Sequence, residues 1–444
     1  MKIVQIKARL PWLIASMLLL PLGTAAHPQA LSESKDEVTY AIRDGDTLIG
    51  LGNRFFVSAE AYKTVERANG MSETSRLRIG STIIIPTSVL KFTPLVARVI
   101  AFKGHANLVS SGHTVPVALQ MLVSEGTLIE TAPDGYLTLQ LASGSKVAIP
   151  SNARVRISRM RTYLLTKGTD TDFTVERGRT ETTVVPLRDN RSRFRIRTPV
   201  AISAVRGTVL RIGYDGPDAA SLTEVVEGHV AVSLTGSTAR TTLPSGFGAA
   251  ASSSGKLDRE ALLPPPTFVD GDAEQRGSAV TFKLRPDQAS TGYHIEVAKD
   301  AAFVDIVTGG RSSGPSVEIG ALPDGTYWAR AMAIAPSGLE GLPQTQTFTR
   351  RLEALVADRL PGSKRAYRLT WNLAATKRAT YRLQLFEARD PGTPVIDEPG
   401  LTSAEMTVYG LAPGRYLWRI GRVRSVRGKL EQYWTPFESL SIDL

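Results

Sequence analysis

The chain has 444 residues, of which 42% are apolar and 21% charged, with 53 basic against 42 acidic side chains and no cysteine. At roughly 100–200 residues per domain, this length predicts two to four domains. The composition excludes a disordered chain. The lack of cysteine excludes disulfides, a cysteine nucleophile, thiolate metal sites and a lipid-modified cysteine.

Residues 1–26 have the pattern of a secretory signal peptide. Three basic residues precede an apolar run from Leu10 to Leu22, and Thr24-Ala25-Ala26 places small residues before a cut. The run is shorter than the roughly 20 residues of a spanning helix, although an uncleaved anchor is the alternative. We therefore expect export to the periplasm, no transmembrane segment in the mature chain, and a net charge lowered from +11 to about +8.

Residues 38–87 differ from the rest because two helical patterns stand between two short strand patterns. The first strand begins at Val38, and Asp44-Gly45-Asp46-Thr47 then predicts a turn and a helix N-cap. A second helix, which Ser58 can cap, ends at Asn69-Gly70, since both residues tolerate a positive φ. A short β-branched run closed by Pro86 completes a strand–helix–helix–strand order.

This segment resembles the LysM domain. The matching positions are Tyr40, Gly45-Asp46-Thr47-Leu48, Val57, Val65, Asn69, Leu77, Gly80, Ile83, Ile85 and Pro86. The resemblance implies a two-stranded sheet with two helices on one side. It also implies binding of N-acetylglucosamine-containing glycans, usually peptidoglycan, in a shallow groove between the two loops that join strands and helices.

Such a groove requires hydrogen-bonding groups for acetamido and hydroxyl groups and apolar side chains for a sugar face. Backbone groups and the Asp/Thr pair supply the former, and Met71 or Ile79 the latter. The alternative is that these residues only cap and end the helices. The predicted glycan-binding residues are Gly45, Asp46, Thr47, Leu48, Asn69, Gly70, Met71 and Ile79.

Residues 95–235 show short apolar runs separated by turn signals, which predicts an all-β domain. Gly126–Leu139 and Phe194–Thr208, with Arg-Thr-Pro followed by Val-Arg-Gly-Thr in the second, resemble the FecR domain. The resemblance implies a repetitive β domain outside the cytoplasm. Typical FecR proteins relay a transporter signal to a sigma factor through a cytoplasmic part and a spanning helix. The sequence shows neither, so only the sensing or interaction domain is expected here.

Arginines alternate along two predicted strands of this domain. Arg193, Arg195 and Arg197 share one strand face, and residues 91–254 carry 19 basic against 12 acidic side chains. One interpretation is a solvated strand face, and the other is contact with an acidic partner in the envelope. Nucleic acid is not an expected partner, because no groove-reading motif is present.

Residues 236–266 are rich in Ser, Gly and Ala and end in three prolines, which predicts a linker. Two similar units follow, residues 267–350 and 360–444. Tyr293 matches Tyr381 and Tyr327 matches Tyr416, at offsets of 88 and 89 residues. These repeats loosely resemble fibronectin type III domains, and Trp328 and Trp418 are predicted core residues.

No catalytic residues, metal ligands or cofactors are predicted. Gly310–Gly314 has nucleophile-elbow spacing, but no histidine follows it, and the five histidines lack zinc-site spacing. We expect a mostly β multidomain protein that is not an enzyme, binds glycan, and presents its β domains to an unidentified envelope protein. The alternative is a sensory component of an envelope signalling system.

Overall fold

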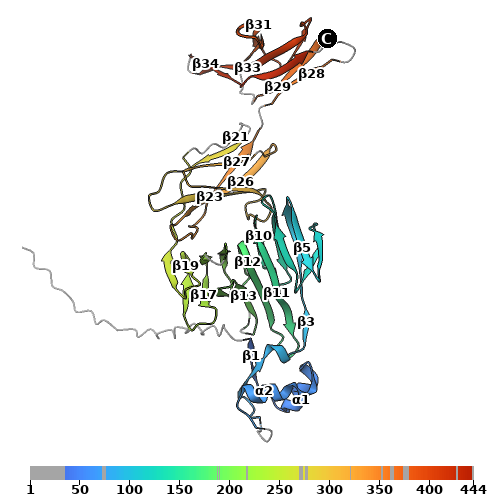
Figure 1. Ribbon diagram of the computed structural model, residues 1–444, viewed down its shortest axis with the longest axis vertical. Helices are drawn as coiled ribbons and strands as arrows, with labels where there is room; N and C mark the ends of the chain where they lie inside the picture. The colour runs from blue at the N-terminus through green and yellow to red at the C-terminus, as the bar shows by residue number, and fades with distance from the viewer. Residues whose placement is uncertain are drawn as a thin grey trace, which may run out of the picture. The chain divides into compact units, whose positions relative to one another are not determined.

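The computed structural model describes residues 36–72, 77–187, 189, 191–216, 219–269, 274–275, 279–320, 322–351, 354–360, 365–373, 380–426 and 429–442. Strands dominate this part of the chain, and its helices all lie within residues 48–89 (Figure 1). The mostly β multidomain fold predicted from the sequence is therefore confirmed. The predicted signal peptide, residues 1–26, lies outside the described residues.

The N-terminal module, residues 37–89, has a strand–helix–helix–strand order. Its elements are β1 (Glu37–Ala41), α1 (Leu48–Phe55), the 3₁₀ turn η1 (Ala59–Ala61), α2 (Tyr62–Ala68), β2 (Thr82–Pro86) and the 3₁₀ turn η2 (Thr87–Val89). The two strands are antiparallel, with Tyr40 opposite Ile83. Ser58 makes no side-chain cap, so η1 rather than a capped turn leads into α2. The core includes Leu51, Val65 and Tyr163, the last contributed by the central region.

The central region, residues 92–261, consists of two sheets that share the long strand β12 (Thr169–Thr183). The first sheet runs β6 (His113–Pro116), β5 (Ala106–Ser110), β8 (Leu128–Thr131), β11 (Arg154–Tyr163), β12, β13 (Arg193–Arg197), β14 (Ala201–Val205), β17 (His229–Leu234) and β18 (Arg240–Pro244), with β3 (Phe92–Pro94) also paired to β11. The second runs β7 (Leu122–Ser124), β4 (Val96–Lys103), β9 (Tyr136–Leu141), β10 (Lys146–Ile149), β12, β15 (Val209–Tyr214), β16 (Ser221–Glu227), β19 (Phe247–Ala251) and β20 (Leu257–Ala261).

Strand β12 passes from one sheet to the other at Gly178. Arg177 pairs with Arg154 in the first sheet, and Gly178 pairs with Tyr214 in the second. Gly178 has φ +84°, and a Cβ there would lie 2.6 Å from the Cα of Ala153. Only glycine fits this crossing without strain. The apolar faces of the two sheets then form one core that includes Ile157 and Phe173.

The prediction of a linker over residues 236–266 is wrong for most of its length, because β18, β19 and β20 lie there. Small side chains do not prevent core packing where larger side chains surround them. Ala249 and Ala251 are each only 1% exposed and pack in the core of the central region.

The two repeats have separate cores. The first contains β21 (Glu274–Gln275), β22 (Val280–Lys283), β23 (Gly292–Ala298), β24 (Ile306–Ser312), β25 (Ser316–Ile319), β26 (Gly325–Ile334) and β27 (Gln344–Arg350). The second contains β28 (Ala354–Arg359), β29 (Ala366–Asn372), β30 (Thr380–Glu387), β31 (Asp390–Leu401), β32 (Glu405–Tyr409), β33 (Gly414–Val426), β34 (Lys429–Trp434) and β35 (Glu438–Ile442).

The duplication seen in the sequence recurs in the strand register. Glu296 on β23 lies opposite Arg330 on β26, and Gln384 on β30 lies opposite Arg419 on β33. Trp418 is buried in the core of the second repeat. The prediction for Trp328 is wrong, because this residue lies one position earlier in the repeat and packs on the outer face.

Candidate binding surfaces

The first predicted glycan-binding loop, Gly45–Leu48, is held by polar side chains within it and just before it. The Asp46 carboxylate accepts hydrogen bonds from the Tyr40 hydroxyl and the Arg43 backbone N–H, both at 2.8 Å. Thr47 Oγ1 accepts from the Gly50 N–H at 2.9 Å and caps α1. The capping role therefore occurs, while Gly45 and Thr47 remain exposed. The Leu48 side chain is buried among the core residues, which leaves only its backbone for a ligand.

The end of the second predicted loop, Asn69–Ile79, lies beside the residues that precede the first. The Gly80 N–H donates to the Ile42 carbonyl at 2.9 Å, and the Ile42 N–H donates to the Ser81 carbonyl at 2.8 Å. Ile79, directly before Gly80, is 68% exposed. An isoleucine this exposed is available to a sugar face.

The remaining predicted residues serve mainly the fold. The Asn69 amide donates to the Val65 and Ile84 carbonyls, and its Oδ1 accepts from the Ile84 N–H, so it ties α2 to β2. Gly70 takes φ +60° at the helix end and is exposed. Met71 packs against the core of the module. The structure thus brings both loops together, with Gly45, Thr47, Gly70 and Ile79 as their exposed members.

The alternating arginines of the central region are neither solvated nor free for a partner. Arg195 is 1% exposed, and its guanidinium lies 3.2 Å from Asp170 and 3.1 Å from Asp172. Arg193 and Arg197 pair with the same two aspartates at 2.9 and 2.7 Å. Parallel pairing of β12 with β13 sets Asp170 opposite Arg193 and Asp172 opposite Arg195. Both predicted interpretations of these arginines are therefore wrong.

Asp36 connects this cluster to the start of β1. Its carboxylate accepts two hydrogen bonds from Arg159, at 2.6 and 2.5 Å, and one from Arg195 at 3.1 Å. The hydrogen bond from Arg159 lowers the pKa of Asp36 well below its usual value. Burial, followed by the Asp170 charge, raises the pKa of Tyr163 to about 12. We call Asp36, Asp170, Asp172 and their arginines the aspartate node.

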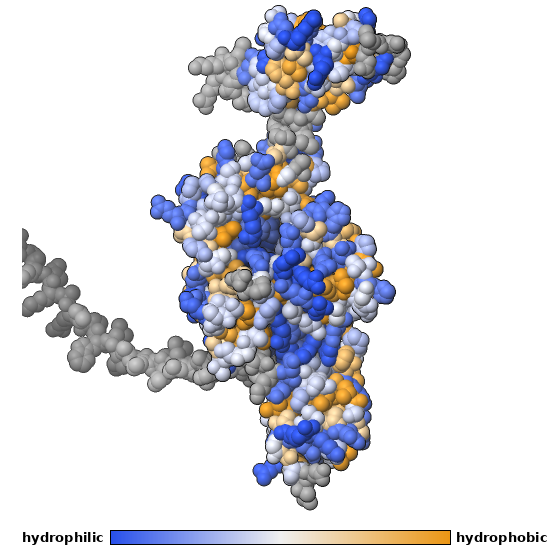
Figure 2. All heavy atoms as spheres, in the orientation of Figure 1, coloured by the Kyte–Doolittle hydropathy of each residue, from blue (hydrophilic) through white to orange (hydrophobic). Residues whose placement is uncertain are grey.

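Other arginines on β11 have similar partners nearer the surface. Arg154 and Arg156 both contact Glu176, at 2.7 and 2.8 Å, and Arg161 contacts Glu125 at 3.0 Å. Hydrophilic residues gather over β11 and β12 in the space-filling view (Figure 2).

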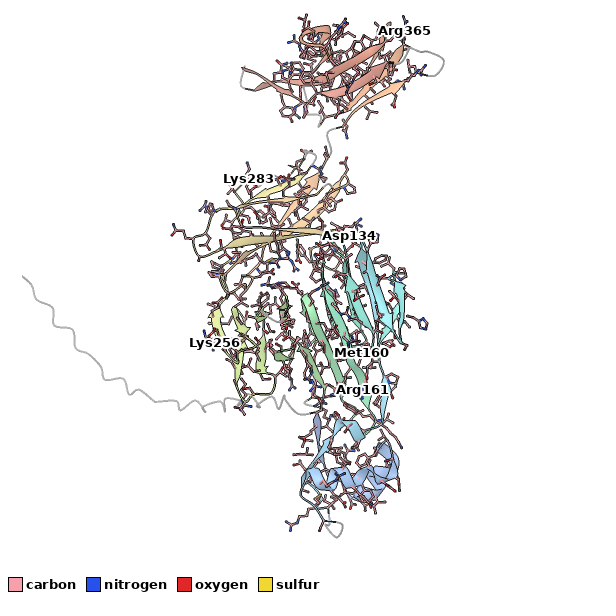
Figure 3. All side chains as sticks on the ribbon, in the orientation of Figure 1. Asp134, Met160, Arg161, Lys256, Lys283 and Arg365 are labelled. Carbon is pink, nitrogen blue, oxygen red and sulfur yellow. The ribbon has the colours of Figure 1, made fainter. Side chains whose placement is uncertain are left out.

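Met160, which precedes Arg161 on β11, faces inward and is 1% exposed (Figure 3). A cavity of about 190 Å³ lies at Met160, lined also by Leu95, Leu141 and Phe194.

A second buried cluster lies between the central region and the first repeat. Glu224 pairs with Arg179 and Arg211, both at 2.9 Å. Arg211 also donates to the Glu340 and Gly341 carbonyls, at 2.9 and 2.7 Å. The Glu340 carboxylate lies 3.0 Å from His294 Nδ1 and also contacts Arg311. Although burial opposes it, the Arg179 charge and His294 keep the pKa of Glu340 well below its usual value.

The acidic members of both clusters were not predicted, because the strand patterns were interpreted for the arginines and not for the carboxylates that could pair with them. Asp170-x-Asp172 alternates in the same way as Arg193-x-Arg195, and this matching spacing was the available signal. Nothing local marks Asp36 or Glu340, whose partners lie far away in the sequence, whereas Glu224 lies opposite Arg211 in the antiparallel pair of β15 and β16. Among the residues that the structure describes, no group of three or more His, Cys, Asp or Glu could hold a metal ion.

The described helices include none long and apolar enough to cross a membrane.

Comparison with known proteins relates one part of the chain to a family. No curated protein matches the chain. A solved protein described as an anti-sigma factor from Parabacteroides distasonis is 18% identical, over 30% of this chain and 59% of that chain, with a TM-score of 0.25. A two-domain fibronectin type III segment of chicken tenascin is 12% identical, over 39% of this chain and 97% of that chain, with a TM-score of 0.17. The FecR protein family matches residues 127–231, and the chain therefore carries a FecR domain there.

Proposed function

We propose that this protein is an exported, non-enzymatic component of the cell envelope. In this proposal the N-terminal module binds N-acetylglucosamine-containing glycan, in particular peptidoglycan, through the loops at residues 45–48 and 69–79. The FecR domain and the two repeats present surfaces for protein interaction in the periplasm. The observation that carries the proposal is the FecR match over residues 127–231, on the same chain as a module whose two loops lie side by side.

The geometry of the module supports the glycan part. The two loops offer exposed backbone at Gly45 and Gly70, the exposed Thr47, and the exposed apolar side chain of Ile79. Exposed polar backbone beside an apolar side chain suits a sugar, whose hydroxyl and acetamido groups need hydrogen bonds and whose ring face needs an apolar contact. The aspartate node ties Asp36 to the central region, so glycan bound by the module would also hold the FecR domain in place.

A second candidate is a sensory component of an envelope signalling system, which the FecR match favours. In that case the FecR domain would act as the receptor, and a partner would carry the signal onward. Deleting the gene separates the two candidates. Loss of a transcriptional response to an envelope cue indicates signalling, whereas a response that is unchanged indicates a scaffold.

Co-sedimentation of the full chain with purified, insoluble peptidoglycan tests the glycan part. Ile79→Ser is the variant to use, because Asp46 and Thr47 support the fold. Val57→Ser is the matched control. Val57 is 59% exposed, but it lies past the C-terminal end of α1, where its backbone N–H donates to the Val89 carbonyl. We expect Ile79→Ser to weaken binding about tenfold and Val57→Ser to leave it unchanged. A chain that fails to pellet with peptidoglycan and fails to bind chitin oligomers would remove this function.

A further inference from the structure

The two repeats place the same arginine at the same point of the same sheet face, but in different surroundings. Arg330 lies opposite Glu296 in the first repeat, and Arg419 lies opposite Gln384 in the second. Since each arginine points away from its own core, its surroundings show what covers that face. Comparing the two faces therefore shows whether one of them lacks a partner.

In the first repeat the face is covered by the central region. Arg330 pairs with Glu296 at 2.6 Å and with Glu181 of β12 at 2.8 Å. Tyr136 of β9 packs with Ala298, Phe303 and Ile306 on the same face. A carboxylate beside an aromatic side chain is thus the covering that this chain itself supplies for the arginine.

In the second repeat Gln384 replaces the glutamate. Its Oε1 accepts from Arg419 at 3.0 and 2.7 Å, and its amide nitrogen donates to Asp397 at 3.0 Å. Asp397 already receives two hydrogen bonds from Arg382, both at 2.6 Å. Asp397 therefore pairs directly with Arg382 and is connected to Arg419 only through Gln384. Among the described residues of this repeat, no carboxylate lies within ion-pair distance of Arg419.

Aromatic rings surround Arg419. Its guanidinium lies 4.3 Å from the centre of the Trp434 ring and 4.7 Å from that of Phe437. Phe437 is 40% exposed. Such rings hold the guanidinium flat and partly desolvated, a setting in which a further carboxylate binds more strongly than it does at an open surface.

We propose that this face of the second repeat is the docking surface for a separate protein, which places an Asp or Glu side chain on Arg419 as Glu181 does on Arg330. A second copy of this chain is not the expected occupant, because its Glu181 and Tyr136 are already covered by its own first repeat. The inference deepens the protein-interaction part of the proposed function and does not depend on glycan binding.

The test is photo-cross-linking of the full chain in the cells that naturally produce it, with benzoylphenylalanine in place of Phe437. We expect an adduct with another protein, cross-linked within a few residues of an Asp or Glu. Arg419→Gln should reduce the adduct at least tenfold. Arg389→Gln should not, since Arg389 is 85% exposed in the turn after β30 and pairs with Glu387 at the end of that strand.

A matched probe separates this inference from the wider proposal. Benzoylphenylalanine in place of Tyr409, which is 72% exposed on the other sheet of this repeat, should give no such adduct. A protein adduct from Tyr409 but not from Phe437 overturns the inference and leaves the protein-interaction function standing. The absence of any adduct removes both. An adduct with a second copy or with a glycan, or one insensitive to Arg419→Gln, also overturns the inference.

Discussion

The N-terminal module and the central region use polar groups in opposite ways. In the central region, the sequence of the arginine-rich strands resembles that of a binding surface. Carboxylates of the same chain nevertheless pair with these arginines, as Asp170 pairs with Arg193 and Arg195. In the module, residues 31–90 carry 7 basic and 8 acidic side chains, so its charges nearly balance, although Arg43, Asp44 and Arg78 at the loops are exposed. A high density of charged residues in a sequence therefore does not mean that the charges are available to a partner, whereas the exposed side chain of Ile79 is available for contact.

The largest effect is expected at Asp170, whose carboxylate is fully buried among Arg159, Arg193 and Arg195. Asp170→Asn leaves those guanidinium groups without their shared partner and should destabilise β12 and β13 by about 3–5 kcal/mol. Native-state amide hydrogen exchange of these strands measures the change. Asp258 forms an exposed pair with Lys256, so Asp258→Asn should change the free energy of opening measured by amide exchange by less than about 1 kcal/mol. Equal effects would mean that the aspartate node is no more important than a surface pair.

Glu340→Gln is expected to have the next largest effect, about 2–4 kcal/mol, because it removes a buried charge shared by Arg179, Arg311 and His294. Since this cluster lies between the central region and the first repeat, amide exchange should rise in both β16 and β26. A rise confined to β26 would show that the cluster does not couple the two.

The module should respond more weakly. Thr47→Ala removes the hydrogen bond to the Gly50 N–H and should destabilise α1 by about 1 kcal/mol. Thr47→Ser keeps the hydroxyl, so the stability of α1 should differ from that of the wild type by only about a few tenths of a kcal/mol. Amide exchange of α1 measures both variants, and identical exchange in both would contradict the capping role.

The smallest effect concerns pH. The pKa of Asp36 is lowered in the folded protein by Arg159, so its stabilising contribution is present above the ordinary value of 3.8 and is lost as the pH falls below it. The midpoint of thermal unfolding should therefore fall more steeply between pH 5 and pH 3 in the wild type than in Asp36→Asn. Parallel pH profiles would contradict this contribution.

Local patterns predicted much of the fold. The cap at Thr47, the end of α2 at Asn69-Gly70, and the duplicated register of the repeats depend on residues close in sequence or on internal similarity. The strands between residues 240 and 261 were missed because small residues pack only where a distant strand supplies bulk. The partners of the arginines were missed for the same reason, since Asp36 and Arg195 are 159 residues apart.

The salt dependence of peptidoglycan binding tests the contrast between the two regions most directly. If the loops hold the glycan through uncharged contacts and the arginines of the central region are internally paired, the full chain should co-sediment with peptidoglycan equally well in 50 mM and in 500 mM NaCl, where the Debye length falls from about 14 Å to about 4 Å. Ile79→Ser should weaken binding at both concentrations. A loss of tenfold or more in the wild type at the higher salt concentration, with Ile79→Ser indistinguishable from the wild type, would show that charge holds the protein to the wall and would contradict the account.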